Sequence, residues 1–596
     1  MQKYQVNQVL IENLLSWVTS GEIAIPEIQR PFVWSSSQVR DLIDSLYRGY
    51  PVGYIIIWKN PDVKLKDGSI SVGKKIIIDG QQRIIALTTA IVGQEVVDKD
   101  FRKIRIQIAF NPIEERFEVI NSAILKDRRW IKDISPVITN EVRLTKLVRE
   151  YLRENPEVDE EKIEDVLERL KNIMKKQIGI IELAGELDIE TVTEIFIRIN
   201  SRGVELSQAD FAMSKIASNE IYGGNTLRKA IDYFAHLAVK PEFYSEILNN
   251  DKEFAQTEFF KKISWLKNEN DDLYDPSYKD ILRVAFTYKF NRGKLKDLVS
   301  LLSGRNFETR EYEEEIARNS YMLLREGVMA FINEYDFKGF LMTIKSAGFI
   351  DKRLIRSVNA LNFAYILYLK LREQKYEQFK LEKIVRRWFV LSLLTGRYSG
   401  STESFFDYDI KQFAQKGVEQ YLTEIEKEKL SEAFWNAELL RKLETSVSSA
   451  PVFNVFLASQ CYFNDKAFLS KDYTVRTLIE QRGDIHHIFP KDVLKKRGLT
   501  RGEYNQVANY VFTQTEVNIK IKNKPIEIYM NEIKEQCNGG EIKYGSITKY
   551  EELIENFKQN AIPESILDMT TNDYKEFLSQ RRKLMAEKIK EFYNTL

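Results

Sequence analysis

Short hydrophobic runs alternate with helical periodicities over about the first 215 residues of the chain. The runs are rich in β-branched residues, which is typical of buried or half-buried strands. They occupy residues 54–59, 74–79, 105–110, 117–120 and 178–183, and helical patterns occupy residues 38–47 and 161–176. This mixture predicts an α/β or α+β domain over residues 1–215.

Helical patterns dominate both before the first of these runs and after the last. Residues 1–18 are amphipathic and predict a first helix, without the charged start and the small-residue cleavage site of a secretory signal. From Leu206 to about residue 440 one amphipathic helix follows another, and after about residue 445 a mixed segment leads into further helices. We therefore predict a multidomain α+β chain with domain boundaries near residues 215 and 445. The predicted domains are 1–215, a helical middle region 216–445, and 446–596.

Length, charge and cysteine content narrow the function classes. The 596 residues allow roughly three to five domains. The 89 Lys and Arg against 88 Asp and Glu leave a net charge of +1, so any nucleic-acid surface must be local. Two cysteines, Cys461 and Cys537, exclude a disulfide framework and a four-cysteine zinc site. No apolar run has the length of a membrane span, so we expect a cytoplasmic protein without a membrane partner.

Histidine occurs only three times, and two of the three positions are adjacent. His486 and His487 stand in the segment DIHHIFP, whereas His236 lies in a helical pattern and fits a core or surface position. Asparagines follow His487 at fixed distances, Asn509 after 22 residues and Asn518 nine residues later. The adjacent pair and this spacing make the segment the first candidate for chemistry.

A β-hairpin followed by a helix would give the spacing a structural meaning. The strand end with the histidines would lie beside a helix that begins near Thr515, with Asn518 one turn into it. An imidazole nitrogen and an amide oxygen could then share a metal ion. Neighbouring strand residues point to opposite faces, so we assign His486 to the metal and His487 to water activation. A neutral histidine beside a divalent ion suits phosphodiester hydrolysis.

The segment resembles the HNH, or ββα-metal, nucleases, in the form with a DHIxP or EHIxP opening and two later asparagines. The resemblance implies that His487 is the general base, that His486 and Asn518 are metal ligands, and that Asn509 braces the loop between the strands. Histidine at position 486, where aspartate is more usual, extends the expected ion from Mg²⁺ to Mn²⁺. On the residues alone, the histidines could also be turn residues and the asparagines caps or turn formers.

Basic residues gather after the histidine pair. Residues 491–524 contain eight Lys and Arg against three Asp and Glu, a local charge of +5 in a chain of net +1. Such a cluster favours contact with a phosphate backbone, although a solvated basic helix has the same composition. The predicted nucleic-acid contacts are Lys495, Lys496, Arg497, Lys520, Lys522 and Lys524.

Three polar segments stand out in the first domain, IPEIQRPFVW, DGQQR and FIRINSRGVELS. In the second, a buried strand ends at Asp79, Gly80 permits a sharp turn, and a helix begins near Gln81 or Gln82. The free amides of the helix start and the Arg83 cation would hold an anion such as a nucleotide phosphate, and Asp79 could bind Mg²⁺ or polarise a water. The first segment presents Gln29, Arg30 and Trp34, and the third presents Arg198, Asn200 and Arg202. Each segment alone fits a turn with ion pairs.

Together and in this order, the three segments resemble the DUF262 family, whose fold is similar to ParB and sulfiredoxin-like domains and whose DGQQR motif is associated with nucleotide hydrolysis. Residues from Arg386 onward look like the later helical part of that family, and residues 446–596 resemble DUF1524. The whole is similar to GmrSD-type and SspE-type modification-dependent restriction proteins. The resemblance implies catalytic roles for Asp79 and Arg83, within a nucleotide site formed by Gln29, Arg30, Asp79, Gly80, Gln81, Gln82, Arg83, Arg198 and Asn200.

The predicted function is that of a metal-dependent DNA endonuclease of prokaryotic antiphage defence, which nicks or cuts DNA under the control of NTP and DNA modification. The expected partners are modified phage DNA or modification-bearing host DNA, a nucleotide (GTP, ATP or UTP) and, for a double-strand break, a second protomer of a homo-oligomer. The alternative is a modification sensor or assembly protein with a degenerate nuclease domain. In a third interpretation, the Asp79–Arg83 pocket recognises a DNA modification or a flipped base and does not hydrolyse a nucleotide.

Overall fold

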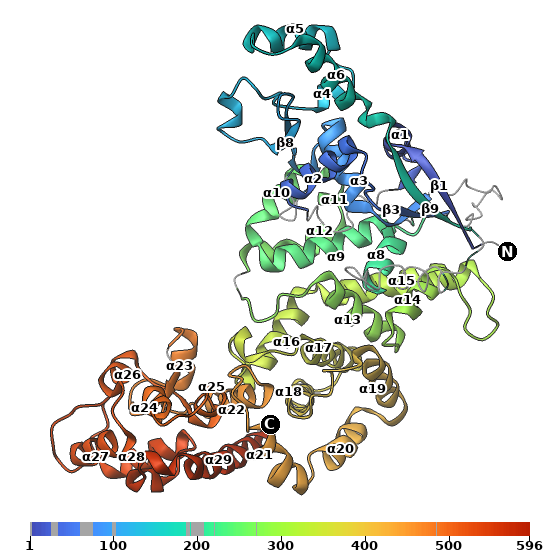
Figure 1. Cartoon of the computed structure of the whole chain (residues 1–596). Coiled ribbons are helices and arrows are strands. Elements are labelled where there is room, and N and C mark those ends of the chain that lie inside the picture. The colour runs from blue at the N-terminus through green and yellow to red at the C-terminus, as the bar shows by residue number, and fades with distance from the viewer. Residues whose placement is uncertain are drawn as a thin grey trace. The chain divides into compact units, whose positions relative to one another are not determined.

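The computed structural model describes residues 3–24, 34–59, 75–97, 103–185, 187, 191, 208–217, 219, 221–269, 271–483 and 485–596 (Figure 1). The chain is mixed α+β and mostly helical, and it divides into two compact units. The first comprises residues 1–267 and 295–322, and the second comprises 268–294 and 323–596. Residues 446–596 thus share one unit with the helices that precede them.

The first unit contains a mixed sheet and helices. Its strands are β1 (Tyr4–Leu10), β2 (Ile23–Ala24), β3 (Tyr54–Lys59), β4 (Lys75–Asp79), β5 (Val96–Val97), β6 (Lys103–Ile104), β7 (Ile108–Asn111), β8 (Arg116–Val119) and β9 (Gln177–Leu183). Its helices are α1 (Ile11–Thr19), α2 (Ser36–Arg48), α3 (Gln81–Leu87), α4 (Ser135–Ile138), α5 (Leu144–Glu154), α6 (Glu160–Lys171), α8 (Gln208–Ala217), α9 (Gly224–Val239), α10 (Tyr244–Asn250), α11 (Lys252–Ala255), α12 (Glu258–Ile263), α14 (Leu295–Leu302) and the first half of α15 (Glu314–Phe331).

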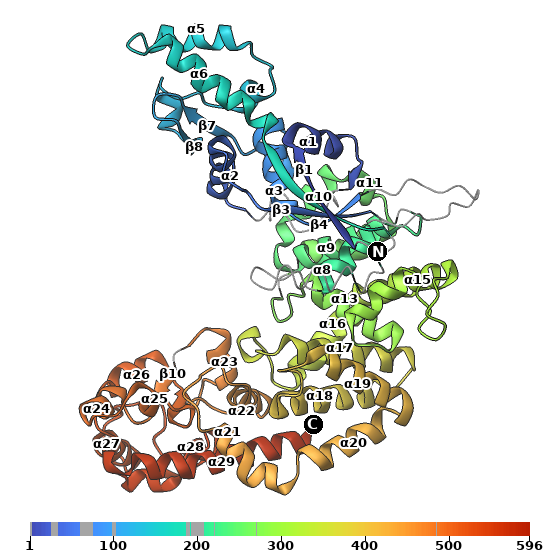
Figure 2. The same cartoon turned by 45° about the vertical axis from the view of Figure 1, so that its right-hand side comes forward.

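The described strands of the main sheet follow the order β1-β9-β3-β4-β2. Strand β1 is antiparallel to β9 and β3 is antiparallel to β4, whereas the β9–β3 and β4–β2 pairs are parallel. Ile55, Ile57 and Ile77 are fully buried and join side chains of α1, α2 and α3 in one hydrophobic core. Figure 2 shows these three helices beside the strands of the sheet. The strands predicted over residues 54–59, 74–79 and 178–183 are confirmed, because their isoleucines fill this core.

Two local predictions differ from the structure. The helix predicted over residues 1–18 is wrong in its first half, where β1 pairs with β9 along its whole length and α1 begins only at Ile11. Pairing with a neighbouring strand outweighs a local helical periodicity here. The strand predicted over residues 105–110 begins only at Ile108, and the backbone N–H of Ile106 donates to the hydroxyl of Thr89 at 3.0 Å instead.

The second unit carries the remaining helices and a short two-stranded sheet. Its helices are α13 (Tyr278–Phe290), the second half of α15, α16 (Glu334–Ser346), α17 (Val358–Glu373), α18 (Gln378–Thr395), α19 (Thr402–Lys416), α20 (Val418–Lys429), α21 (Leu439–Lys442), α22 (Pro451–Tyr462), α23 (Val475–Glu480), α24 (Lys491–Lys496), α25 (Arg501–Tyr504), α26 (Thr515–Ile521), α27 (Ile526–Cys537), α28 (Tyr550–Gln559) and α29 (Tyr574–Thr595). The strands β10 (Ile485–His487) and β11 (Tyr510–Phe512) form the sheet.

A buried ion pair ties three helices of the second unit together. Arg397 follows α18, and its Nε donates to the carboxylate of Asp409 in α19 at 2.7 Å. The hydroxyls of Tyr398 and Tyr421 donate to the same carboxylate at 2.7 and 2.8 Å, and Tyr421 belongs to α20. Because every oxygen of Asp409 is bonded, the buried charge is satisfied and the helices are fixed relative to one another. Among the helices of the described residues, none is both long and apolar enough to span a membrane.

Candidate functional site

The histidine pair lies on a β-hairpin that is followed by a helix. Strands β10 and β11 are antiparallel, with His486 opposite Val511 and His487 opposite Tyr510. Helix α26 begins at Thr515, three residues after β11 ends, and Figure 2 shows β10 among the short helices α23 to α26. The strand, strand and helix that the asparagine spacing predicted are therefore present, at the predicted positions.

The structure brings His486 and Asn518 together. The Nδ1 of His486 lies 2.7 Å from the Oδ1 of Asn518, which is the fourth residue of α26. His486 is only 3% exposed, and burial lowers its pKa to about 4, so its ring is neutral at physiological pH. Its second nitrogen, Nε2, is buried and has no hydrogen-bond partner among the described residues.

These two residues fit the metal ion that the HNH resemblance implies. Their 2.7 Å contact is a hydrogen bond in which the amide oxygen accepts, so Nδ1 of His486 carries the proton here and the lone pair is on the buried Nε2. A metal ion held by this pair would need the other tautomer of His486, with the lone pair on Nδ1, and the amide oxygen of Asn518 suits a hard cation. No group of three or more His, Cys, Asp or Glu gathers within the described ranges in a way that could hold a metal. Two protein ligands would leave the other positions to water and phosphate oxygens, as is common for Mg²⁺.

His487 points away from His486 and is held by a different asparagine. Its Nε2 lies 2.9 Å from the Oδ1 of Asn505, and its ring meets the ring of Tyr510 edge to face at 5.0 Å. Since an amide oxygen only accepts, Nε2 carries the proton and Nδ1 is left with the lone pair. Burial lowers the pKa of His487 below its ordinary value, which keeps the base in its neutral form. Asn505 was not predicted, because no spacing rule distinguishes it from the other asparagines of the segment.

Asn509 is fully buried between the two strands. Its side-chain oxygen accepts from the N–H of Phe489 at 2.8 Å, and its amide donates to the carbonyls of Phe489 and Tyr504 at 3.0 and 3.3 Å. The N–H of Ile488 donates to the Asn509 carbonyl at 2.9 Å. These bonds connect the chain directly after His487 to the start of β11, the place that the resemblance implied for a bracing asparagine.

A buried arginine supports the same hairpin from helix α29. Arg581 is completely buried and donates to the carbonyls of Ala508, Tyr510 and Asn560 at 2.8, 2.7 and 3.2 Å. Burial lowers the pKa of its guanidinium to about 9. Two of the three carbonyls flank Asn509. The sequence offered no signal for this contact, because Arg581 lies 71 residues beyond Tyr510.

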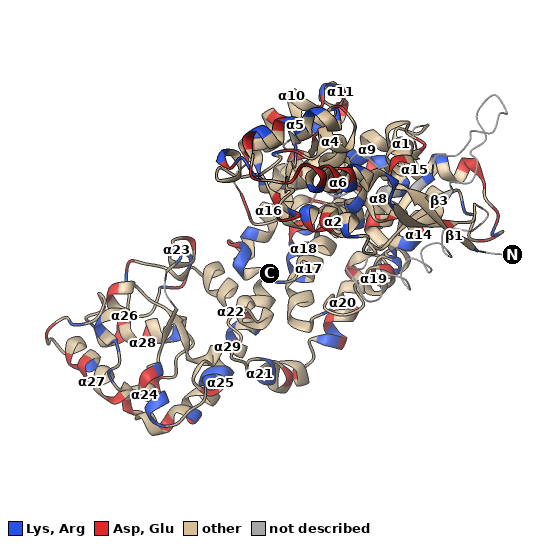
Figure 3. Cartoon of the chain, turned by 45° about the horizontal axis from the view of Figure 1, so that its top comes forward, with Lys and Arg blue, Asp and Glu red and all other residues tan. Residues whose placement is uncertain are grey.

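The predicted nucleic-acid residues divide into two groups. Lys495, Lys496, Arg497, Lys520 and Lys522 are exposed, and Figure 3 shows basic segments along α24 and α25. Lys524 is engaged within the protein, because its ammonium donates to Glu532 at 2.9 Å and to the hydroxyl of Tyr544 at 2.6 Å. Arg497 also donates to the side-chain oxygen of Asn572, and Lys495 lies 3.8 Å from Asp492. Lys496, Lys520 and Lys522 are therefore the better candidates for phosphate contacts.

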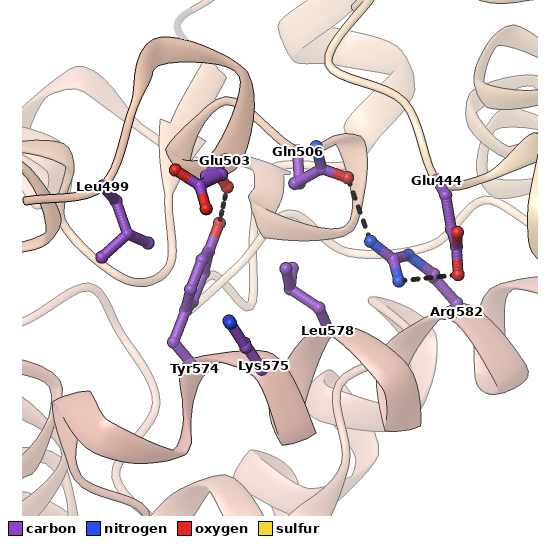
Figure 4. Close-up of a pocket in the computed structure, with 8 residues that line it drawn as sticks. All are labelled: Glu444, Leu499, Glu503, Gln506, Tyr574, Lys575, Leu578 and Arg582. Carbon is purple, nitrogen blue, oxygen red and sulfur yellow. Dashed lines mark hydrogen bonds and ion pairs between the residues drawn. The ribbon is translucent and has the colours of Figure 1, made fainter.

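A shallow pocket lies between α29 and the segment that carries Asn505 (Figure 4). The Arg582 guanidinium crosses it and donates to Gln506 at 3.0 Å and to Glu444 at 3.3 Å. At the other end, the hydroxyl of Tyr574 donates to the Glu503 carbonyl at 2.9 Å. The polar groups of the pocket are thus largely satisfied by one another, and the pocket anchors the connection between β10 and β11. It is lined by Glu444, Leu499, Glu503, Gln506, Tyr574, Lys575, Leu578 and Arg582.

The DGQQR segment forms the predicted strand, turn and helix. Strand β4 ends at Asp79, Gly80 has a positive φ of 93°, and α3 begins at Gln81. A Cβ at Gly80 would lie 2.9 Å from the Cγ1 of Ile55, so both the backbone angle and the space require glycine. The Nη1 of Arg83 donates to the Tyr54 carbonyl at 2.7 Å. This contact fixes Arg83 against the first residue of β3.

The other predicted members of the amino-terminal site cannot be placed. Gln29, Arg30, Arg198, Asn200 and Arg202 lie outside the described residues. Of the three polar segments, the structure therefore places the DGQQR turn and Trp34, and the nucleotide site remains a prediction.

The first part of the chain is similar to a known family. Residues 11–217 match the family of the GmrSD restriction endonuclease, N-terminal domain. The chain is also 25% identical to the uncharacterized protein MJ0686 of Methanocaldococcus jannaschii, in an alignment of 650 positions that covers 97% of this chain and 98% of that protein. The family match includes the DGQQR turn and ends well before the histidine hairpin.

Proposed function

We propose that this chain, whose N-terminal region is of the GmrSD restriction endonuclease type, is a metal-dependent DNA endonuclease with its nuclease centre at His486, His487 and Asn518. One observation carries the proposal. The two predicted metal ligands, 32 residues apart in sequence, meet at 2.7 Å beside a half-buried histidine that its own asparagine orients. A restriction-type N-terminal region makes DNA the expected substrate.

The residues of the hairpin have separate roles in phosphodiester hydrolysis. Asn505 holds the Nε2 proton of His487, so Nδ1 is free to take a proton from the attacking water. His486 and Asn518 would hold the ion, which offsets the negative charge that builds on the phosphate. The exposed lysines of α24 and α26 contact the flanking phosphates, where each neutralised phosphate adds salt-sensitive affinity.

The amino-terminal turn supplies regulation in this proposal. Asp79, Gly80, Gln81, Gln82 and Arg83 bind an NTP together with Gln29, Arg30, Arg198 and Asn200, and Asp79 and Arg83 take part in its hydrolysis. GTP, ATP and UTP are the ligands to compare. The support is the family match and the glycine turn that leaves the first amides of α3 at the end of β4. The biological setting would be prokaryotic antiphage defence against modified DNA, or in partnership with modified host DNA.

A plasmid assay tests the nuclease half of the proposal. Supercoiled DNA with Mg²⁺ or Mn²⁺ should be nicked or linearised by the parent protein, and His487→Ala should reduce the rate by about 10²- to 10⁴-fold, the usual contribution of a general base. His236→Ala is the matched control, because His236 packs against Phe243 in the first unit. Equal cutting by the parent and His487→Ala would refute the assignment.

One observation favours a second candidate function, a modification sensor or assembly protein with a degenerate nuclease centre. His486 Nδ1 and Asn518 Oδ1 are hydrogen-bonded to each other, and such a bond can close a site as well as prepare it. Calorimetric titration with Mn²⁺ distinguishes the two. Binding that is lost in both His486→Ala and Asn518→Ala supports the nuclease, and the absence of any binding supports the sensor. If the Asp79–Arg83 pocket instead recognises a modified or flipped base, it will bind modified DNA and not NTP.

A further inference from the structure

The first strand of the chain lies at an edge of the main sheet. Strand β1 pairs with β9 on one side, and no other described strand pairs with it. Every residue from Lys3 to Gln8 is exposed, and Tyr4 and Val6 are 50% and 54% exposed. Natural proteins usually protect such an edge with charge, proline, a bulge or a short strand, because its free backbone groups can pair with another chain.

The register shows which backbone groups face outward. Lys3 accepts from the N–H of Ala184 at 3.1 Å, and Ile11 donates to the carbonyl of Lys176 at 3.0 Å. The pairing between these two bonds has no bulge, so the odd-numbered residues of β1 hydrogen-bond to β9. The N–H and C=O groups of Tyr4, Val6 and Gln8 therefore point away from the sheet, and no hydrogen bond joins them to another described backbone group.

None of the usual protections is present in β1. Its seven residues, YQVNQVL, contain no charge and no proline, and the ladder to β9 is regular from Tyr4 to Leu10. A like strand can therefore approach without electrostatic repulsion. The absence of charge favours a second copy of the same strand over a charged partner, for which this edge has no complement.

We propose that β1 is the interface of a two-fold dimer, in which β1 pairs antiparallel with β1 of a second copy of this chain. The two-fold axis passes beside Val6. In this register Val6 faces Val6 of the other copy, Gln5 faces Asn7, and Tyr4 faces Gln8, so valine meets valine, amide meets amide, and the tyrosine ring lies beside an amide side chain. All six outward groups of Tyr4, Val6 and Gln8 then find partners on each copy. Two five-stranded sheets become one continuous sheet.

The dimer is proposed independently of the nuclease proposal, but it has a consequence for it. Each chain has one adjacent histidine pair, and a double-strand break needs two such centres or two successive nicks. A strand pair alone is small for a protein interface, so we expect a reversible dimer whose population rises with concentration.

Cysteine cross-linking tests the register. Residues that face each other in a hydrogen-bonded antiparallel pair have Cα atoms about 5.5 Å apart, within the range of a disulfide. Val6→Cys should therefore cross-link on mild oxidation. Gln8→Cys is the matched control on the same face, because the two copies of residue 8 would be separated by four strand residues, about 14 Å. We expect at least tenfold faster cross-linking for Val6→Cys, and the native Cys461 and Cys537 are buried in both variants.

Sedimentation of the full chain, without DNA, nucleotide or metal, tests the interface itself. Val6→Pro removes only an outward N–H, which edge strands tolerate, and it should raise the dimer dissociation constant at least tenfold, whereas Val6→Thr should not. A parent protein that is monomeric at all concentrations overturns the proposal, as does equal cross-linking of the two cysteine variants. Because no nuclease activity is measured, failure here is distinct from failure of the proposed function.

Discussion

The histidine hairpin and the DGQQR turn both place candidate site residues at the end of a strand, but the two are held in different ways. Side chains from three separate elements converge on the hairpin, namely Asn505, Asn518 and Arg581. The turn is held by its own glycine and by a contact of Arg83 with the neighbouring strand. Orientation of each histidine ring by a specific partner is what catalysis requires, whereas the described part of the turn is a scaffold. The more complete candidate site therefore lies in the second unit.

The largest expected loss of stability comes from replacing Arg581, which supports the hairpin from helix α29. Arg581→Met would leave three buried carbonyls without their donor, and each such loss costs about 1–3 kcal/mol, partly offset by removal of a buried charge. We expect the free energy of unfolding to fall by about 3 kcal/mol in urea denaturation. Arg582→Met, the next residue on α29, has its partners at the more exposed pocket and should cost about 1 kcal/mol. Equal losses for the two variants would contradict the special role of Arg581.

Replacing the glycine of the DGQQR turn should lower the free energy of unfolding less than Arg581→Met does. Gly80→Ala forces an L side chain into a positive φ and against Ile55, so we expect a loss of about 2 kcal/mol by the same denaturation experiment. Gly21→Ala serves as the control, since it has a positive φ of 75° but open space around its Cβ, and it should cost about 1 kcal/mol. If Gly80→Ala is as stable as the parent, the close approach to Ile55 does not constrain the turn.

The pH dependence of the nicking rate tests whether Asn505 acts on His487. Burial lowers the pKa of His487 and the Asn505 bond raises it, so the acid limb of the nicking rate should lie below the ordinary histidine pKa. Asn505→Asp places a negative charge beside Nε2, raises the pKa of His487 and should move the acid limb to higher pH. Asn505→Leu removes the bond and should move it to lower pH. Shifts in the same direction in both variants would show that Asn505 does not act through His487.

The features that could be predicted from the sequence belong to motifs with a fixed spacing. The spacing from His487 to Asn509 and Asn518 predicted the hairpin and its helix, and DGQQR predicted its turn. The edge strand β1 was missed because its pattern also fits a helix, and only pairing with β9 decides between them. Asn505 and Arg581 could not be found, since their roles arise from contacts that only the folded chain creates. The engagement of Lys524 with Glu532 was hidden for the same reason.

The smallest expected effect concerns the basic residues. Lys520→Gln together with Lys522→Gln should weaken DNA binding and reduce the slope of log affinity against log salt by about 2, one for each lost phosphate contact. Lys524→Gln should change the slope little, because Lys524 is already paired within the protein. Fluorescence anisotropy at several salt concentrations measures both. A larger slope change for Lys524→Gln than for the double variant would show that Lys524, and not the exposed pair, contacts the phosphates.

The most direct test of the central claim is chemical rescue at His487. The variant His487→Gly removes the imidazole and leaves a space beside Asn505 and Tyr510 that free imidazole can occupy. If His487 is the base, plasmid nicking by this variant with Mn²⁺ should be at least 100-fold slower than in the parent and should rise with added imidazole. Nicking at the parental rate without imidazole would contradict the account.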